Sequence, residues 1–374
     1  MPLYPLYALL FTHTGLSDAE ISALFALWSV VGVVGEVPTG ALADRFSRRS
    51  SLAVGGVLQA AGYLLWTTLP GFSAFAAGFV LWGIGGTLVS GAVEAWLYDT
   101  LAAADAESSF ARLYGQVNAC ELIAQVPSAL AATLLLPLGG FDLVGWASVA
   151  TCLGAALLAA RLPEPPRHGA DEPGDGLGYL ATLKAGVTEA VTTPGVRGAV
   201  VVVALLASLD GIEEYFGVLA EDWQVPLQWI SLAVLGIPLA GAAGAAVAGR
   251  LAPRALAPVL LAGVLIFAAA GLFAHPSGLA LVALFYALYR AVLVVGEARL
   301  QERIDGRARA TVTSVAGVGT DLAGLLLYGS WAVAGLPAAL VLAAVVALVL
   351  PLGLGRARAR RGPDPIRPPS ATTT

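Results

Sequence analysis

The chain has 374 residues, of which 58% are hydrophobic and 12% are charged, and its mean hydropathy is +0.81. Such a composition excludes an ordinary water-soluble globule and indicates a protein that spans a lipid bilayer. The net charge of −5 says little here, because the location of charge matters more than its sum in a membrane protein. Cys120 and Cys152 both lie in apolar runs, so no disulfide framework or cysteine–histidine zinc pattern is indicated.

Eleven apolar segments are long enough to cross about 30 Å of hydrocarbon, which takes roughly 20 residues. They lie at 19–43, 51–69, 73–101, 110–136, 142–160, 197–220, 227–249, 255–274, 278–298, 310–333 and 336–354. The start, MPLYPLYALLFTHTG, resembles the outer half of a twelfth helix that is too short to span. We expect either a start codon placed too far downstream or a short first helix, and not a signal peptide, because a basic n-region and a cleavage site are missing.

Basic residues predict the orientation of these segments. Every lysine and arginine except Arg290, which lies within a segment, falls on the same side of the predicted bundle. The positive-inside rule then places that side, with both termini, in the cytoplasm.

The sequence also contains a weak internal repeat. GALADR at 40–45 recurs as GRLAPR at 249–254, and EAWLYD at 94–99 recurs as EARLQE at 297–302. The two offsets are similar and join segments of equal rank and direction, which predicts a duplicated six-helix half. We therefore expect an N-terminal half at 1–162, a cytoplasmic linker at 163–194, a C-terminal half at 195–355 and a disordered basic tail at 356–374.

A charged motif lies between the second and third segments of the predicted bundle. It has the form G-x-x-x-D-R-x-x-R-R and consists of Gly40, Asp44, Arg45, Arg48 and Arg49. With two six-helix halves and a polar linker, this motif resembles the major facilitator superfamily over essentially the whole chain. The resemblance implies an all-α membrane protein, a twelve-helix bundle with a truncated first helix, that works by alternating access and is usually monomeric. The sequence departs from the family pattern at Ser47, where a glycine is usual, and at Pro253, which replaces the acid in the second copy.

The motif predicts a cytoplasmic gate. The resemblance implies that Asp44 lies at the N-terminus of the helix that starts near Arg309, where the helix dipole favours an acid. The motif arginines are expected to pair with Glu94 or Asp99, at the inner end of the fourth helix, or with lipid phosphates. The alternative is that the arginines only enforce topology.

Charges in the membrane interior predict the transport site, because the bilayer makes them costly. The candidates for substrate binding and proton coupling are Glu121, Asp210, Glu213, Glu214, Arg290 and Asp321. Arg290 needs an acidic partner, and Asp210 and Asp321 are the two at similar depth. Glu213 and Glu214 are adjacent, so we expect only one to face the cavity. The alternatives are a structural salt-bridge network for the ion pair, and a hydrogen bond from Glu121 to Asn118 or Gln125.

The three histidines, His13, His168 and His275, lie in loops or in the short start, so a proton relay would use carboxylates. We expect proton-coupled export of a small hydrophobic or cationic solute across the cytoplasmic membrane. The alternatives are a proton-linked importer of a small nutrient, and a membrane sensor or assembly factor on the same scaffold. An enzyme is not expected, since the sequence has no metal cluster, nucleophile elbow or phosphate loop. The expected partners are the solute, protons and membrane lipids, without nucleic acid, metal or cofactor.

Overall fold

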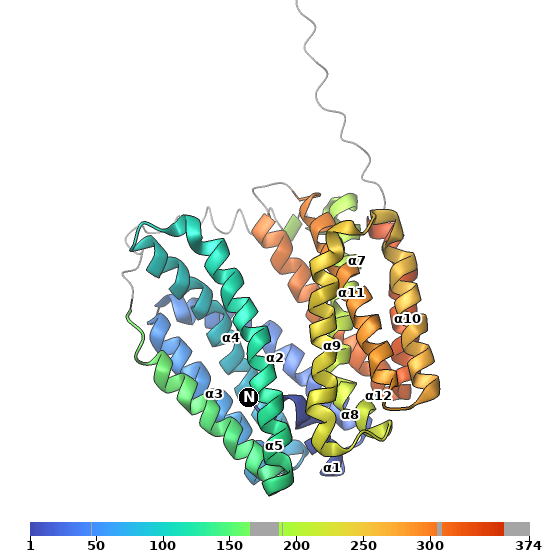
Figure 1. Cartoon of the computed structure of the whole chain (residues 1–374). Helices are drawn as coiled ribbons and strands as arrows, with labels where there is room; N and C mark the ends of the chain where they lie inside the picture. Colours follow the sequence, from blue (N-terminus) through green and yellow to red (C-terminus); the bar gives the residue numbers. More distant parts are fainter. Residues whose placement is uncertain (46, 165–186, 189, 305–308, 355–374) are drawn as a thin grey trace, which may run out of the picture.

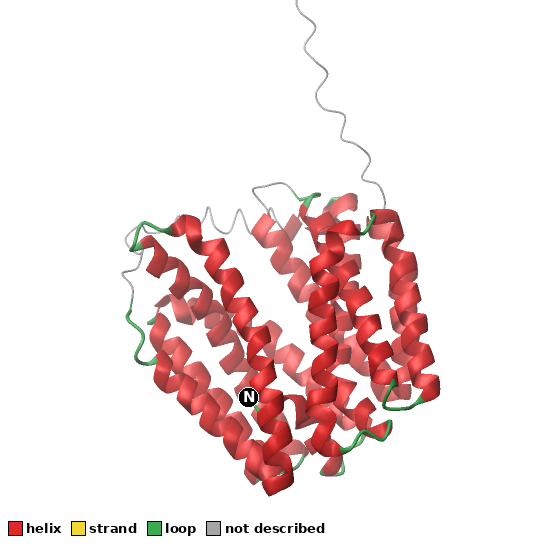
Figure 2. Cartoon of the chain, in the orientation of Figure 1, coloured by secondary structure: helices red, strands yellow, loops and turns green. Residues whose placement is uncertain are grey.

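The structure is a computed structural model that describes residues 1–45, 47–164, 187–188, 190–304 and 309–354. For residues 36–45, 194, 309 and 310, only the backbone is described. Every regular element in this part of the chain is a helix (Figure 2). The expected all-α class is confirmed, and eight of the described helices are long and apolar enough to cross a membrane.

The first bundle begins with two short helical pieces, η1 (Tyr4–Leu6) and α1 (Tyr7–His13). Four long helices follow, with one short turn before the last of them: α2 (Asp18–Arg45), α3 (Arg48–Thr68), α4 (Phe72–Ala102), η2 (Glu107–Ser109) and α5 (Phe110–Ala159). Helix α5 bends sharply at Gly140, whose φ of 62° suits glycine, so its two arms correspond to two of the expected spans.

The second bundle comprises α7 (Pro194–Ala207), η3 (Ser208–Tyr215), α8 (Phe216–Asp222), α9 (Leu227–Val247), η4 (Ala248–Arg250), η5 (Pro253–Ala255), α10 (Leu256–Phe273), α11 (Gly278–Gln301) and α12 (Arg309–Leu354). Helix α12 bends at Gly335, with a φ of 57°, as α5 does at Gly140. The matching bends in the last long helix of each bundle agree with two halves of related architecture.

The helices pack within each bundle, and the buried side chains of both bundles form one hydrophobic core. Helix α3 packs against α4 and α5, while α11 packs against α9 and α10, and α7 packs against α12. The bundles meet through α2 against α12 and α5 against α9. Figure 1 shows the bundles close together at the lower end of the view and farther apart at the upper end.

We call the end at which the bundles are farther apart the arginine-rich end. Residues 302–304 lie at the top of it, and residues 47–49 and 161–164 lie on its left side, because the first bundle is tilted in this view. The lower end, with residues 14–17 and 223–226, is the opposite end. The side chains also differ between the two ends. Buried aromatic residues from both bundles, among them Phe25 and Tyr215, pack together toward the opposite end. Toward the arginine-rich end, the polar residues of α5 are exposed, including Gln116, Asn118 and Glu121.

Candidate functional site

The first long helix of the second bundle is interrupted by a stretch of 3₁₀ geometry. This stretch, η3, spans eight residues between α7 and α8, although 3₁₀ runs longer than about four residues are uncommon. It holds three acids, Asp210, Glu213 and Glu214. Side chains three apart eclipse one another in a 3₁₀ helix, so Asp210 and Glu213 share a face and Glu214 does not.

Asp210 and Glu213 belong to a polar cluster, which we call the midhelix cluster, with Tyr286 and Arg290 of α11. Arg290 Nη1 lies 3.1 Å from Asp210 Oδ2. The Tyr286 hydroxyl donates to Asp210 Oδ1 at 2.7 Å and is 3.1 Å from Glu213 Oε2. Tyr286 and Arg290 are four residues apart and therefore project from one face of α11. Both acids and both α11 side chains thus form one connected network.

A glycine on a neighbouring helix makes room for this cluster. A Cβ added to Gly241 of α9 would lie 2.6 Å from Tyr286 Cδ1 and 3.0 Å from Arg290 Cγ. Any larger residue there would displace the two side chains that hold the acids. We infer that Gly241 positions the cluster by its lack of a side chain.

The charges in the midhelix cluster do not balance. Two carboxylates face one guanidinium, so ionisation of all three groups leaves one negative charge in surplus. Arg290 and Asp210 remain 34% and 38% exposed, so solvent reaches the pair. A proton or a cationic group can therefore neutralise the surplus charge at this place.

Glu214 lies on the other face of η3 and contacts the first bundle. Its Oε2 accepts a hydrogen bond from the Tyr7 hydroxyl of α1. Two further polar contacts join the bundles toward the opposite end: the hydroxyls of Ser22 and Tyr215 are 2.8 Å apart, and His13 Nε2 lies 2.6 Å from Glu221 Oε1. Together with Phe25, these residues close the opposite end between α1, α2 and the second bundle.

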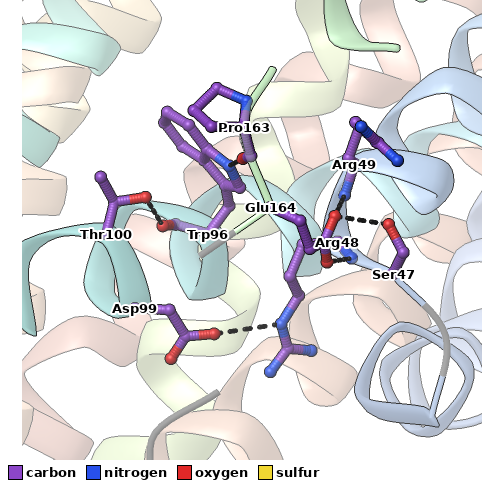
Figure 3. A network of polar contacts seen from close by, with 8 residues as sticks. All are labelled: Ser47, Arg48, Arg49, Trp96, Asp99, Thr100, Pro163 and Glu164. Atoms are coloured by element: carbon purple, nitrogen blue, oxygen red, sulfur yellow. Dashed lines mark hydrogen bonds and ion pairs between the residues drawn. The ribbon is translucent and has the colours of Figure 1, made fainter. Parts of the chain in front are cut away.

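A second polar network surrounds the N-terminus of α3 at the arginine-rich end (Figure 3). Arg48 Nε lies 3.5 Å from Asp99 Oδ2 of α4, and both side chains are largely buried. Glu164, which follows α5, accepts hydrogen bonds from the Ser47 hydroxyl and from the backbone N–H groups of Arg48 and Arg49, at 2.8 and 3.2 Å for the two amides. An acid at this place meets the positive end of the helix dipole.

Ser47 is the N-cap of α3, since its side chain accepts from the Ser50 amide. The residue that departs from the family pattern therefore has a structural role: it both caps α3 and donates to Glu164. On the other side of the network, the Trp96 indole donates to the Pro163 carbonyl at 2.9 Å. The start of the expected linker is thus attached to α3 and α4 of the first bundle.

The structure brings some of the predicted site residues together and separates others. Of the two acids expected for Arg290, Asp210 forms the ion pair, while Asp321 lies half-buried on α12. Glu121 is exposed and, within the described part of the chain, has no hydrogen bond to Asn118 or Gln125.

At the predicted gate, Asp99 pairs with Arg48, and Glu94 is exposed on α4. The predictions for Gly40, Asp44 and Arg45 lie outside the described part of the structure, because only the backbone is described there.

Three residues of these polar networks were not predicted from the sequence. Tyr286 joins both acids of the midhelix cluster, Tyr7 contacts Glu214, and Glu164 caps α3. The spacing of Tyr286, four residues before Arg290, is the signal that could have identified it. The partners of Tyr7 and Glu164 are distant in sequence, and no local spacing indicates them.

Glu164 gives a testable effect on stability. Burial raises the pKa of its carboxyl, but the hydrogen bonds from Ser47, Arg48 and Arg49 outweigh this and hold the pKa below its ordinary value of 4.5. Such a group stabilises the fold above its unfolded pKa, and this contribution is lost as the pH falls through the lowered value. We expect Glu164→Gln to cost about 0.5 kcal/mol, a small amount because the group is solvent-screened.

In a thermal melt in detergent, this corresponds to a Tm lower by about 1–2 °C at neutral pH. The difference from wild type should close as the pH falls through the lowered pKa of Glu164. Glu107→Gln, an exposed acid in η2, is the matched control and should leave Tm unchanged. A Tm difference that persists at acid pH would contradict the role of the ionised carboxylate.

The paired helical bundles, the broken helix and the charged cluster within it define a multi-pass membrane protein of the transporter class. The chain matches the family model described as Major Facilitator Superfamily over residues 1–326. It belongs to that family.

Solved structures with this fold include several transporters. A bacterial homolog of the human lysosomal transporter Spinster, in an inward-facing and occupied conformation, is similar with a TM-score of 0.73 and 14% identity, over 94% of this chain and 90% of that one. The nucleoside transporter NupG gives 0.72 and 14%, over 95% of each chain. A D-xylose–proton symporter gives 0.70 and 15%, over 92% and 91%. No curated protein matches the sequence.

Proposed function

We propose that this transporter exports a small hydrophobic or cationic solute across the cytoplasmic membrane in exchange for protons. The arginine-rich end is the cytoplasmic end in this proposal, in accordance with the positive-inside rule. The observation that carries the proposal is the midhelix cluster, in which Asp210 and Glu213 face the single guanidinium of Arg290. A proton and a cationic solute compete to neutralise the same surplus carboxylate, and this competition couples their movements.

Alternating access requires that the two ends open in turn. The contacts of Tyr7, Ser22 and His13 with the second bundle close the opposite end. The exposed polar face of α5 supports a state that is open to the cytoplasm. Motion of the 1–162 half against the 195–355 half would then exchange one state for the other.

The cytoplasmic gate in this proposal comprises Gly40, Asp44, Arg45, Arg48, Arg49, Glu94 and Asp99. The ion pair between Arg48 and Asp99 fixes the N-terminus of α3 to α4 within the first bundle. This ion pair supports the proposal that the start of α3 and the end of α4 move as one rigid unit when the cytoplasmic end closes. The proposal for Asp44 is that its charge stabilises the closed cytoplasmic end by meeting the N-terminus of a helix of the second bundle.

Transport in inverted membrane vesicles tests the proposal. With the lumen acidified, vesicles that contain the protein should accumulate ethidium, a fluorescent organic cation, and a protonophore should abolish the accumulation. Vesicles that contain the Arg290→Gln variant control for passive uptake. The test would use a panel of organic cations and neutral hydrophobic dyes. Proton-coupled export would be contradicted if none of them accumulates in a way that depends on both the protein and the pH gradient.

Proton-linked import of a nutrient is the second candidate, and the similarity to a D-xylose–proton symporter favours it. In the same vesicles, an importer would move its solute out of the acidic lumen instead of into it. A labelled sugar or nucleoside preloaded in the lumen would then leave faster when the lumen is acid. The direction of movement therefore separates the two candidates.

A further inference from the structure

We propose that Glu214 and Tyr7 form a proton-controlled gate at the opposite end, separate from the midhelix cluster, which closes only when Glu214 carries a proton. The proposal adds a gate to the proposed transport cycle and rests on alternating access in that cycle. The gate determines which end of the protein is open, whereas Asp210, Glu213 and Arg290 bind the proton or the solute.

The surroundings of Glu214 indicate its protonation in the closed gate. Its side chain is only 9% exposed, and its hydrogen-bond partner is the neutral Tyr7 hydroxyl, itself on a residue that is 4% exposed. Within the described part of the chain, no basic side chain forms an ion pair with Glu214. An ionised carboxylate without a cationic partner is strongly disfavoured at a buried site, so the closed gate holds the neutral acid.

Among the described residues, the other titratable groups near Glu214 are tyrosines and the adjacent acid Glu213. Tyr4 of η1 and Tyr328 of α12 lie within electrostatic range of its carboxyl, as does Tyr215 on η3 itself. These hydroxyls stay neutral at physiological pH and can supply only hydrogen bonds. Elements of both bundles therefore surround one acid without supplying a positive charge.

Position makes this acid a gate rather than a binding group. Glu213, the adjacent residue, contacts Tyr286 within the second bundle, whereas Glu214 contacts Tyr7 in the first bundle. Separation of the bundles must therefore break the Glu214 contact and leave the Glu213 contact intact. Once the gate opens, water reaches Glu214, which releases its proton to the outside; reclosure takes a proton from the same side.

The consequence is a dependence of conformation on external pH. Acid outside favours the protonated gate and hence the state that is open at the arginine-rich end. Alkaline conditions favour the ionised acid and hence an open gate. In an exporter, this would speed the return of the carrier after it has released its solute into an acidic exterior.

The two native cysteines provide the measurement. Cys120 is exposed on the part of α5 near the arginine-rich end, and Cys152 is 1% exposed. Labelling of Cys120 by a maleimide thus reports the state open at that end, and protection of Cys152 reports that a variant is folded. The experiment uses the full-length protein in nanodiscs, with labelling expressed relative to denatured protein at the same pH.

We expect the ratio of labelled to protected Cys120 in wild type to be higher at about pH 6 than at about pH 8. Glu214→Gln mimics the protonated acid and should give the high ratio at both pH values. Tyr7→Phe removes the hydrogen bond across the gate and should lower the ratio about fivefold at the acid pH. Glu107→Gln, an exposed acid in η2 outside both sites, is the control and should keep the wild-type pH dependence of labelling. Glu213→Gln, the same substitution one residue away, is the competing variant.

Wild-type pH dependence in Glu214→Gln would overturn the proposal, as would labelling in wild type that does not change with pH. Loss of the pH dependence in Glu213→Gln but not in Glu214→Gln would assign the proton to the midhelix cluster instead. The readout needs no transported solute. A failure of the vesicle experiment with intact pH-dependent labelling would therefore reject the proposed transport and leave the gate standing.

Discussion

Replacing Arg290 with glutamine should abolish transport and reduce the amount of folded protein in the membrane. The substitution leaves Asp210 and Glu213 facing each other across the Tyr286 hydroxyl without a positive charge. Removal of one partner of a buried ion pair costs about 3–5 kcal/mol, and the lower end applies because about a third of each side chain is exposed here. Such a cost lowers the population of folded protein or the rate of transport by about 100-fold. Vesicle transport and the yield of folded protein after size-exclusion chromatography measure both effects.

A double variant separates the structural role of the pair from its role in coupling. Arg290→Gln combined with Asp210→Asn removes both charges of the ion pair and should restore most of the folded protein, because no charge is left unpaired between them. It should not restore transport that depends on the pH gradient. Asp321→Asn in place of Asp210→Asn is the matched control, and should not restore folding. A double variant that transports against a gradient with wild-type pH dependence would show that the pair is merely structural.

Much of the fold follows from the sequence, for physical reasons that are local. Runs of about 20 apolar residues must form helices in lipid, because every backbone polar group has to be satisfied within its own segment. Most of the expected spans correspond to a helix or to one arm of a helix that bends, as α5 does at Gly140, and the span at 197–220 corresponds to the broken helix of α7, η3 and α8. The cost of charge in a bilayer likewise singled out Asp210 and Arg290, which the structure pairs.

The geometry within the broken helix could not be predicted in the same way. The prediction that only one of Glu213 and Glu214 faces the cavity assumed α-helical spacing of about 100° per residue. The structure has a 3₁₀ stretch instead, which also directs Glu213 and Glu214 to different partners and places Glu213 on the face of Asp210. Local propensity does not specify this change. The stretch packs against α12, and its acids Asp210 and Glu213 contact Tyr286 and Arg290 of α11.

Contacts between distant segments were also beyond prediction. The partners of Glu164 lie more than a hundred residues away on α3, and Tyr7 meets Glu214 across the two bundles. Hydropathy predicts which residues are in the membrane, but it does not specify which of them touch. The polar networks at both ends of the molecule therefore form only in the folded chain, where these distant segments come together.

Glu213→Gln should uncouple transport from protons while leaving the ion pair in place. The substitution removes the surplus negative charge of the midhelix cluster, and the amide can still form a hydrogen bond with the Tyr286 hydroxyl. Without that charge, neither a proton nor a cationic solute has a carboxylate to neutralise. Transport of a cation should therefore lose its dependence on the pH gradient, and any movement that remains should run only down the concentration gradient.

Ethidium movement in inverted vesicles, measured with and without an acidic lumen, tests this expectation, since the two conditions should give the same rates in the variant. Glu121→Gln is the competing variant, because Glu121 is the exposed acid on α5 of the other bundle. If Glu121→Gln loses the response to the pH gradient and Glu213→Gln keeps it, the proton pathway runs through the first bundle. If Glu213→Gln keeps the response, that result by itself rejects the surplus carboxylate as the coupling group, because an amide does not titrate in this pH range. The ion pair of Arg290 and Asp210 would then hold the two helices in register and have no part in coupling.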